Sequence, residues 1–139
     1  MKNLFKIASR NTIKEQGNVK WIRYNLDQWY VLEDLNLTND YFEEIFGVYI
    51  IWRFTWTGKS ETIRVGKGMI KYKLFELKNN SRIMKYGKPA NPLYVTWAEA
   101  EQDAAEGIEK YLGLTLNPVV NVPYSKDIEM IKVNLPDIF

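Results

Sequence analysis

The sequence predicts an α+β protein in which a small, mainly antiparallel sheet of three strands is flanked by helices. Apolar runs at 47–54 and 61–66 are separated by a short break, which is typical of a β-hairpin. Two later stretches, 69–80 and 98–113, carry apolar residues at the three- and four-residue spacing of amphipathic helices. With 139 residues, the chain fits one domain.

The composition excludes several kinds of site. The chain has no cysteine and no histidine, which excludes disulfides, a thiol nucleophile, the usual zinc ligands and a histidine general base. Any catalysis must use Tyr, Lys, Arg, Glu or Asp, alone or with an oxygen-liganded cation such as Mg²⁺. No apolar stretch reaches the roughly 18 residues of a membrane span, and no signal peptide opens the chain. We therefore expect a cytoplasmic protein with no membrane partner.

Charge is unevenly distributed along the chain, although the formal net charge is only +2. Eight basic residues and one acid lie between Arg64 and Lys88, and the stretch from Glu99 to Glu109 is acidic. A positive face beside an acidic helix can bind an anion and a cation close together. The alternative is two ordinary solvated faces.

The N-terminal part is expected to hold little regular structure before the hairpin. Its first 17 residues are mixed and basic and predict a loose arm, while 18–35 alternates in a way that favours a strand or hairpin. A short turn is predicted over 41–46, with Asn39 or Asp40 as its cap.

The first helix, predicted over 69–80, has one apolar side. Ile70, Leu74 and Leu77 share that side, and Lys71 lies on the other.

The rest of the chain completes the order strand, strand, helix, strand, helix. The polar stretch 81–92 is predicted as a loop, 93–98 as the third strand and 98–113 as the second helix, with Gly113 suited to its end. The stretch 130–136 predicts a last strand. A small sheet with helices packed on it is the economical arrangement for this order.

Four short motifs, in order, resemble those of the GIY-YIG nuclease domain. Gly47-Val48-Tyr49 is similar to the Gly-Ile-Tyr of the first strand, and Arg64-Val65-Gly66 to the Tyr-Ile-Gly that ends the second. Glu109-Lys110-Tyr111-Leu112 resembles a family helix in which a glutamate precedes a hydrophobic pair. Pro118-Val119-Val120-Asn121 resembles the Pro-x-x-Asn ending.

The resemblance covers residues 47–121, which leaves 1–46 and 122–139 as N- and C-terminal extensions that supply extra strands. It implies a metal-dependent DNA endonuclease that hydrolyses phosphodiester bonds. In such a site, Tyr49 activates water or attacks the phosphodiester, an arginine on the first helix steadies the phosphate, and Glu109 holds Mg²⁺ or Mn²⁺.

The chain departs from the family at three polar positions. The second tyrosine is Arg64 here, the helix arginine falls at Lys73 after a one-residue gap, and a frequent histidine or tyrosine is Leu77. Lys73 can neutralise a phosphate as a point charge, and Arg64 can supply the bidentate fork from the neighbouring strand. Arg64 is also expected to lower the pKa of Tyr49. Leu77 is expected to belong to the core.

The candidate site has catalytic, phosphate-binding and structural members. The catalytic candidates are Tyr49, Arg64, Lys73 and Glu109, with Glu109 also the metal ligand; the phosphate-binding candidates are Lys67 and Lys71; the structural candidates are Gly47, Gly66, Gly68 and Asn121. Tyr49 is expected to point outward if Val48 and Ile50 face inward, and the alternative is a buried tyrosine with a bonded hydroxyl.

Three of these positions have two readings. Lys67 is predicted to lie in a turn between glycines, either close to a phosphate or simply leading into the helix. Glu109 is predicted at a packing edge, with either a metal ion or a salt bridge to Lys73 or Arg64 as its partner. Asn121 is expected to fix a loop by bonding backbone rather than to touch substrate.

Two functions follow, and the residues do not decide between them. The retained Tyr49 and Glu109 favour a DNA endonuclease. The three departures favour a module that kept the fold, lost catalysis, and binds nucleic acid or a protein partner. The sequence does not specify an oligomeric state.

Overall fold

The computed structural model describes residues 14–139. Most of the predicted loose arm lies outside this range, but its last residues, Lys14–Gly17, form a strand. The elements in chain order are β1 (Lys14–Gly17), β2 (Tyr30–Val31), 3-10 turns η1 (Leu32–Asp34) and η2 (Asp40–Phe42), β3 (Phe46–Phe54), β4 (Ser60–Met69), α2 (Ile70–Lys78), α3 (Ser81–Met84), β5 (Tyr94–Glu99), α4 (Gln102–Leu116) and β6 (Ile131–Val133).

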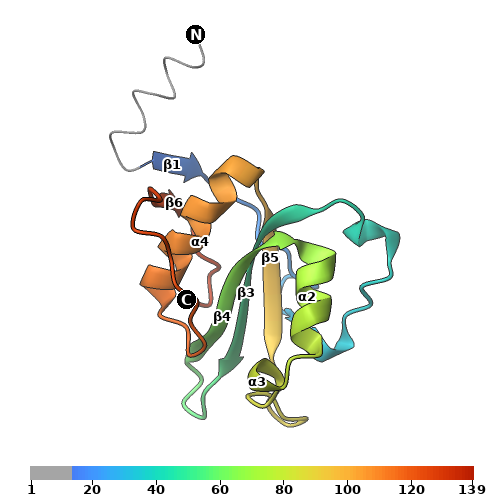
Figure 1. The fold of residues 1–139 in the computed structure, drawn as a ribbon. Coiled ribbons are helices and arrows are strands. Elements are labelled where there is room, and N and C mark those ends of the chain that lie inside the picture. The colour runs from blue at the N-terminus through green and yellow to red at the C-terminus, as the bar shows by residue number, and fades with distance from the viewer. Residues whose placement is uncertain (1–13) are drawn as a thin grey trace.

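An antiparallel sheet of four strands, in the order β2-β5-β3-β4, forms the centre of the molecule (Figure 1). The α+β class and the three predicted strands, β3, β4 and β5, are confirmed, and the N-terminal extension adds β2. The extra terminal strands β1 and β6 pair with each other in parallel as a separate sheet. In the β3–β4 hairpin, Gly47 pairs with Gly68 and Tyr49 with Gly66.

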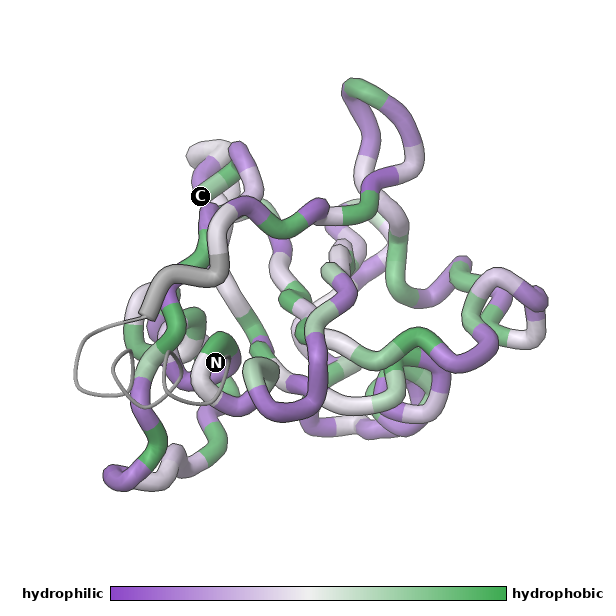
Figure 2. The backbone as a smooth tube through the Cα atoms, turned by 90° about the horizontal axis from the view of Figure 1, so that it is seen from above, coloured by the Kyte–Doolittle hydropathy of each residue, from purple (hydrophilic) through white to green (hydrophobic). Residues whose placement is uncertain are grey.

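Helices cover both faces of the sheet, because successive strand residues point to opposite sides. Val48, Ile50 and Trp52 pack with the apolar side of α4. Tyr49 and Ile51 lie on the other face, in a second core with α2 and α3. Figure 1 shows α4 and α2 on either side of the strands, and in Figure 2 the projecting loops carry hydrophilic stretches.

The helix after the hairpin follows its prediction. α2 spans Ile70–Lys78, and Leu74 and Leu77 are buried on its inner side. The prediction of a plain loop after it is wrong at the start, since Ser81–Met84 forms α3. The side chain of Asn80 caps α3 by accepting a hydrogen bond from the backbone N–H of Arg82 at 2.9 Å.

The last helix has different ends from those predicted. β5 continues to Glu99, so α4 begins only at Gln102. Gly113 lies inside the helix and is buried. α4 ends at Leu116, and its C-cap residue Asn117 has a φ of 50°, a left-handed conformation that asparagine tolerates. Of the helices within residues 14–139, none has both the length and the apolarity needed to cross a bilayer.

The segment before β3 is more irregular than predicted. A strand or hairpin over 18–35 is wrong except at Tyr30–Val31, which pairs with β5. The capped turn is confirmed, because the side chain of Asn39 accepts a hydrogen bond from the N–H of Tyr41 at 2.8 Å, although only a single 3-10 turn follows.

β4 is an edge strand, and the segment after α4 covers part of that edge. The N–H of Val119 donates to the carbonyl oxygen of Thr62 at 3.0 Å, and the N–H of Val120 to that of Ile63 at 2.9 Å. Edge strands are commonly covered in this way. The contact brings the C-terminal segment beside Arg64, the next residue of β4.

Replacing Gly47 by alanine is expected to destabilise the fold by roughly 1–3 kcal/mol. A Cβ at this position would stand 2.0 Å from the backbone oxygen of Ala98 on β5, and no side-chain rotation can relieve that overlap. Urea unfolding measures the change. Lys59→Ala, in the exposed hairpin loop, is the control and should remain close to wild type. A Gly47→Ala protein as stable as wild type would contradict the close approach of β3 and β5.

Candidate active site

Tyr49 lies near the middle of β3 with its ring over Gly66, its partner on β4. A Cβ at Gly66 would stand 2.1 Å from the Tyr49 hydroxyl oxygen, so the glycine makes room for the phenol. The prediction that Tyr49 points outward is wrong. Tyr49 does lie on the other face of the sheet from Val48 and Ile50. The face that carries Tyr49 also packs against helices, however, so only 3% of Tyr49 is exposed.

Burial raises the pKa of the Tyr49 hydroxyl to about 12. Arg64 opposes the rise in pKa through its charge and as a hydrogen-bond donor, while the charges of Glu109 and Glu76 add to it. The prediction that Arg64 lowers this pKa is confirmed, but desolvation outweighs the guanidinium, so the net shift is upward. Because this pKa lies far above 7, the Tyr49 phenol is protonated at neutral pH. Tyr49 is thus a hydrogen-bond donor at neutral pH.

Glu109 lies half-buried on α4, next to the apolar side of the helix. Desolvation raises the pKa of its carboxyl group, and Lys67 gives the largest opposing effect. Glu106 adds to the rise in pKa, whereas Arg64 and Lys73 oppose it. The carboxylate therefore shares its surroundings with three cations, which come from β4 and α2.

Glu109 has no ion-pair partner within 4.0 Å among residues 14–139. Neither of the salt bridges considered from the sequence, to Lys73 or to Arg64, is formed. The Nζ of Lys73 lies 3.9 Å from Oε1 of Glu76 instead, within α2. The Nε of Arg64 is buried and has no hydrogen-bond partner in the same part of the chain. Both the carboxylate and the guanidinium therefore keep unused bonding capacity.

Lys67 belongs to a strand and not to a turn. It pairs with Val48, and β4 continues to Met69 before α2 begins. The predicted turn around Gly66-Lys67-Gly68 is therefore wrong, although Lys67 does lie close enough to Glu109 to be the main charge acting on it.

The side chain of Lys73 packs on Gly68, whereas Lys71 lies away from Glu109. Gly68 has a φ of +136°, and a Cβ there would stand 2.9 Å from Cε of Lys73. The Nζ of Lys71 lies 4.0 Å from Oε1 of Glu43. Residues two apart on a helix do not share a face, so Lys71 is directed away from the group around Glu109.

Two further expected positions stand outside the polar group. Leu77 is 5% exposed and belongs to the core, as predicted. Asn121 is exposed, and its side chain forms no hydrogen bond with any residue from 14 to 139. The backbone of Val119 and Val120, bonded to β4, fixes this segment instead.

Tyr124 is a site residue that sequence reasoning missed. Its ring packs on Gly113, where a Cβ would stand 1.9 Å from the Tyr124 hydroxyl oxygen. Burial and then Glu109 raise the pKa of Tyr124, while Arg64 opposes the rise, and Glu109 and Tyr124 line the same small cavity. Gly113 was the available signal, but the sequence predicts it at the end of the helix, where a glycine needs no packing partner.

The residues present fit a divalent cation bound through one protein carboxylate. Mg²⁺ usually keeps several waters and is bound by one or two carboxylates together with substrate phosphates. Glu109, half-buried and without an ion pair in the described chain, fits that role. No group of three or more acidic residues within 14–139 is placed to hold a metal ion by itself.

A small cavity touches the site only at Glu109 and Tyr124, and Tyr49, Arg64, Lys67 and Lys73 do not line it. A cavity of about 30 Å³, enough for one water, is lined by residues that include Glu109 and Tyr124. Hollows of about 860 Å³ and 600 Å³ lie near the hairpin loop and the N-terminal segment, and neither is lined by Tyr49, Arg64 or Glu109. Convergent polar groups, rather than volume, mark the candidate site.

No protein-family model, curated protein or solved structure was found to match the chain. The resemblance to the GIY-YIG domain therefore depends on the motifs and geometry of this chain.

Alkaline titration should reveal the buried phenol. The difference in phenolate absorbance between wild type and Tyr49→Phe should have its midpoint near pH 12, about two units above a free tyrosine. The raised pKa stabilises the fold fully below about pH 10, and this contribution is lost as the pH rises from about 10 to 12. Tyr49→Phe should therefore lose less stability across that window. A difference midpoint near pH 10 would show that the phenol is accessible to water.

Proposed function

We propose that the protein is a divergent GIY-YIG-type DNA endonuclease, which hydrolyses phosphodiester bonds with a divalent metal ion. The observation that carries the proposal is that a phenol, a guanidinium, two ammonium groups and a carboxylate lie within electrostatic reach of one another around the edge strand β4, with Tyr49 on the α2 face of the sheet and α4 on the other. They come from four elements: Tyr49 from β3, Arg64 and Lys67 from β4, Lys73 from α2 and Glu109 from α4. Phosphoryl transfer needs such a group, because charge that develops on the phosphate must be neutralised.

The order of the elements supports the family assignment. β3, β4, α2, β5 and α4 follow the order strand, strand, helix, strand, helix along the chain. The motif glycines also have spatial roles. Gly47 admits the backbone of β5, Gly66 admits the ring of Tyr49, and Gly68 admits the side chain of Lys73.

Arg64 is the residue best placed to bind the scissile phosphate. Its Nε is buried and unpartnered in the described structure, so a phosphate oxygen would restore a hydrogen bond that the fold does not supply. Lys67 and Lys73 add positive charge beside it. Tyr49, protonated at neutral pH, orients the attacking water or donates to a phosphate oxygen.

Glu109 would hold Mg²⁺ or Mn²⁺. The bound ion supplies Lewis-acid stabilisation of the phosphate and leaving oxygen. The contribution of the chain is a half-buried carboxylate, kept free of an ion pair in the described residues and held on the helix that covers the same sheet face as Lys67.

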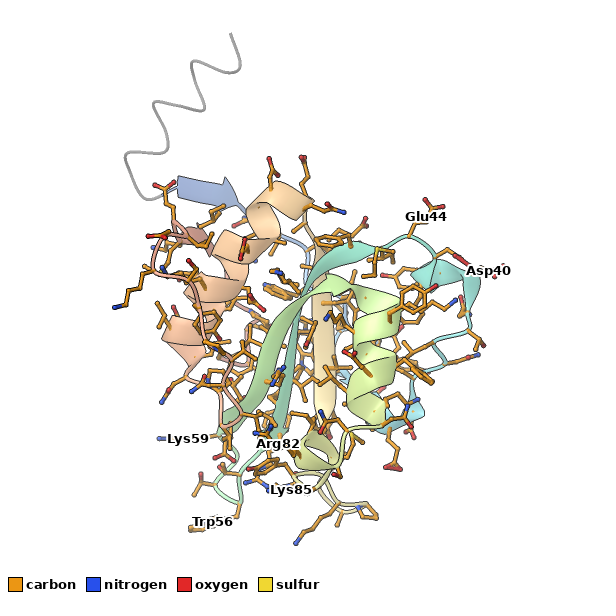
Figure 3. The ribbon with its side chains drawn as sticks, viewed as in Figure 1. Asp40, Glu44, Trp56, Lys59, Arg82 and Lys85 are labelled. Carbon is orange, nitrogen blue, oxygen red and sulfur yellow. The ribbon has the colours of Figure 1, made fainter. Side chains whose placement is uncertain are left out.

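Exposed basic residues give DNA a second area of contact. Arg82 and Lys85 are exposed on and after α3, and Lys59 is exposed in the β3–β4 loop. Figure 3 shows them at the same end of the molecule as Trp56. DNA affinity depends largely on such phosphate contacts. We assign the activity to the cytoplasm as part of this proposal.

Wild-type protein should nick supercoiled plasmid in the presence of Mg²⁺ or Mn²⁺. Tyr49→Phe and Glu109→Gln should each reduce the nicking rate by about 100-fold or more, because each removes a group that acts in the transition state. Arg64→Lys should also lose activity, because lysine keeps the charge but not the bidentate fork. Gel analysis of plasmid forms measures the rates.

Asp103→Asn is the matched control for Glu109→Gln, because Asp103 is an exposed acid in the first turn of the same helix. It should nick at nearly the wild-type rate. An inactive wild type with both metal ions, or activity that survives both substitutions, would overturn the endonuclease proposal.

A catalytically inactive module that binds nucleic acid or a protein partner is the second candidate. Trp56 favours it, since this side chain is 97% exposed at the tip of the hairpin. Aromatic side chains stack on bases, and tryptophan is also enriched at protein interfaces. The core position of Leu77, where the family often has a polar residue, points the same way.

For this second function we expect DNA retention without nicking. Affinity should fall steeply as salt rises, and Trp56→Ala should weaken binding at every salt concentration without changing the salt slope. Lys59→Ala, near the same loop, should instead lower the slope by about one. Binding titrations at several salt concentrations measure both effects. A wild type that neither nicks nor retains DNA would leave a protein partner as the function.

A further inference from the structure

We propose that Tyr124 and Arg64 together bind one phosphate group, through the Tyr124 hydroxyl and the Arg64 Nε. Both atoms are buried hydrogen-bond donors without a partner among residues 14–139. Buried polar groups are nearly always bonded, so both donors are available to an acceptor that the described residues do not supply. The inference rests on the proposed function, because it names donors for the phosphate of that same site.

The segment that carries Tyr124 is held on both sides of it. Before Tyr124, the N–H of Val120 donates to the edge of β4 at 2.9 Å. After it, the Nζ of Lys110 on α4 donates to the carbonyl oxygens of Ser125 at 2.9 Å and Ile128 at 2.7 Å. The phenol is therefore fixed between β4 and α4, the elements that carry Arg64 and Glu109.

Gly113 determines where the hydroxyl lies. It follows Glu109 by one helical turn, and residues four apart lie on the same face of a helix. Because Gly113 has no side chain, the Tyr124 hydroxyl packs directly against α4 beside the carboxylate. Glu109 acts on this hydroxyl through its charge and forms no hydrogen bond with it. The raised pKa of Tyr124 keeps its proton in place at neutral pH, so the group is a donor.

The chemistry of the donors selects an anion. A hydroxyl, a guanidinium N–H and the nearby Lys67 and Lys73 offer donors and positive charge, and a phosphate offers several acceptor oxygens. Inorganic phosphate and the phosphodiester of DNA share these oxygens. A test with both probes therefore distinguishes a general phosphate site from one that needs the nucleic acid.

The test is thermal unfolding of the full chain with increasing inorganic phosphate, at constant ionic strength maintained with chloride. The melting temperature of wild type should rise with phosphate, because only the folded state binds it. Tyr124→Phe should leave the melting temperature without phosphate unchanged or higher, and should weaken apparent phosphate affinity about tenfold or more. Tyr72→Phe, an exposed tyrosine on α2, is the matched control and should respond like wild type.

Gly113→Ala tests the same geometry without removing the hydroxyl. The added Cβ would displace the phenol, so the phosphate response should weaken in the wild-type background. In a Tyr124→Ala background the same change should have no further effect on that response. An additive loss in the double variant would contradict the role of Gly113 in placing the hydroxyl.

The inference would be overturned by a wild type that gives no phosphate response and whose affinity for a short DNA duplex does not depend on Tyr124. It would also be overturned by a Tyr124→Phe protein that keeps full affinity for phosphate and duplex, or by one that is less stable without ligand. The last result would mean that the hydroxyl has a structural partner. A phosphate response that depends on Tyr124, in a protein that does not nick plasmid, would support the phosphate site and refute only the endonuclease. Nicking that is indifferent to Tyr124→Phe would refute only the role of Tyr124.

Discussion

The packing of the Tyr49 ring on Gly66 governs the geometry of the site. The β3–β4 register pairs these two residues, so the ring lies across the edge strand, with its hydroxyl beside Arg64. The burial that this packing produces also raises the pKa of the phenol to about 12 and keeps its proton in place at neutral pH. One backbone pairing thus sets both the position of the phenol and its chemical state.

Two further glycines make room for side chains of the site, as Gly66 does for Tyr49. Gly68 makes room for Lys73, and Gly113 makes room for Tyr124, so functional side chains from different elements pack against bare backbone. These close contacts remove water from polar groups that the fold does not fully pair. A buried Arg64 Nε without a partner in the described residues and a half-buried Glu109 carboxylate destabilise the free protein. Their persistence is understandable if a bound phosphate and a cation supply the missing interactions.

The two candidate functions use the same anion-binding geometry and differ in whether the bound phosphodiester is then hydrolysed. Binding needs only the donors and positive charges around Arg64, together with exposed basic residues for the rest of the nucleic acid. Hydrolysis also needs Tyr49 and Glu109 to act on water and on a metal ion. Leu77 packs in the core and takes no part in either function. A chain of this fold can therefore lose catalysis and still bind, which is why binding and nicking must be measured separately.

The sequence by itself determined the hairpin, α2, the existence of α4, and the group of Tyr49, Arg64 and Glu109 as candidates. Alternation and helical periodicity are local patterns, and they survive folding unchanged. Tertiary structure decided the burial of Tyr49 and the contribution of Tyr124. A strand pattern shows which residues share a face but not what covers that face, and no local signal shows which distant segment returns to it. The segment carrying Tyr124 reaches Glu109 only through backbone bonds to β4 and the Lys110 contacts on α4, which exist once the layers have assembled.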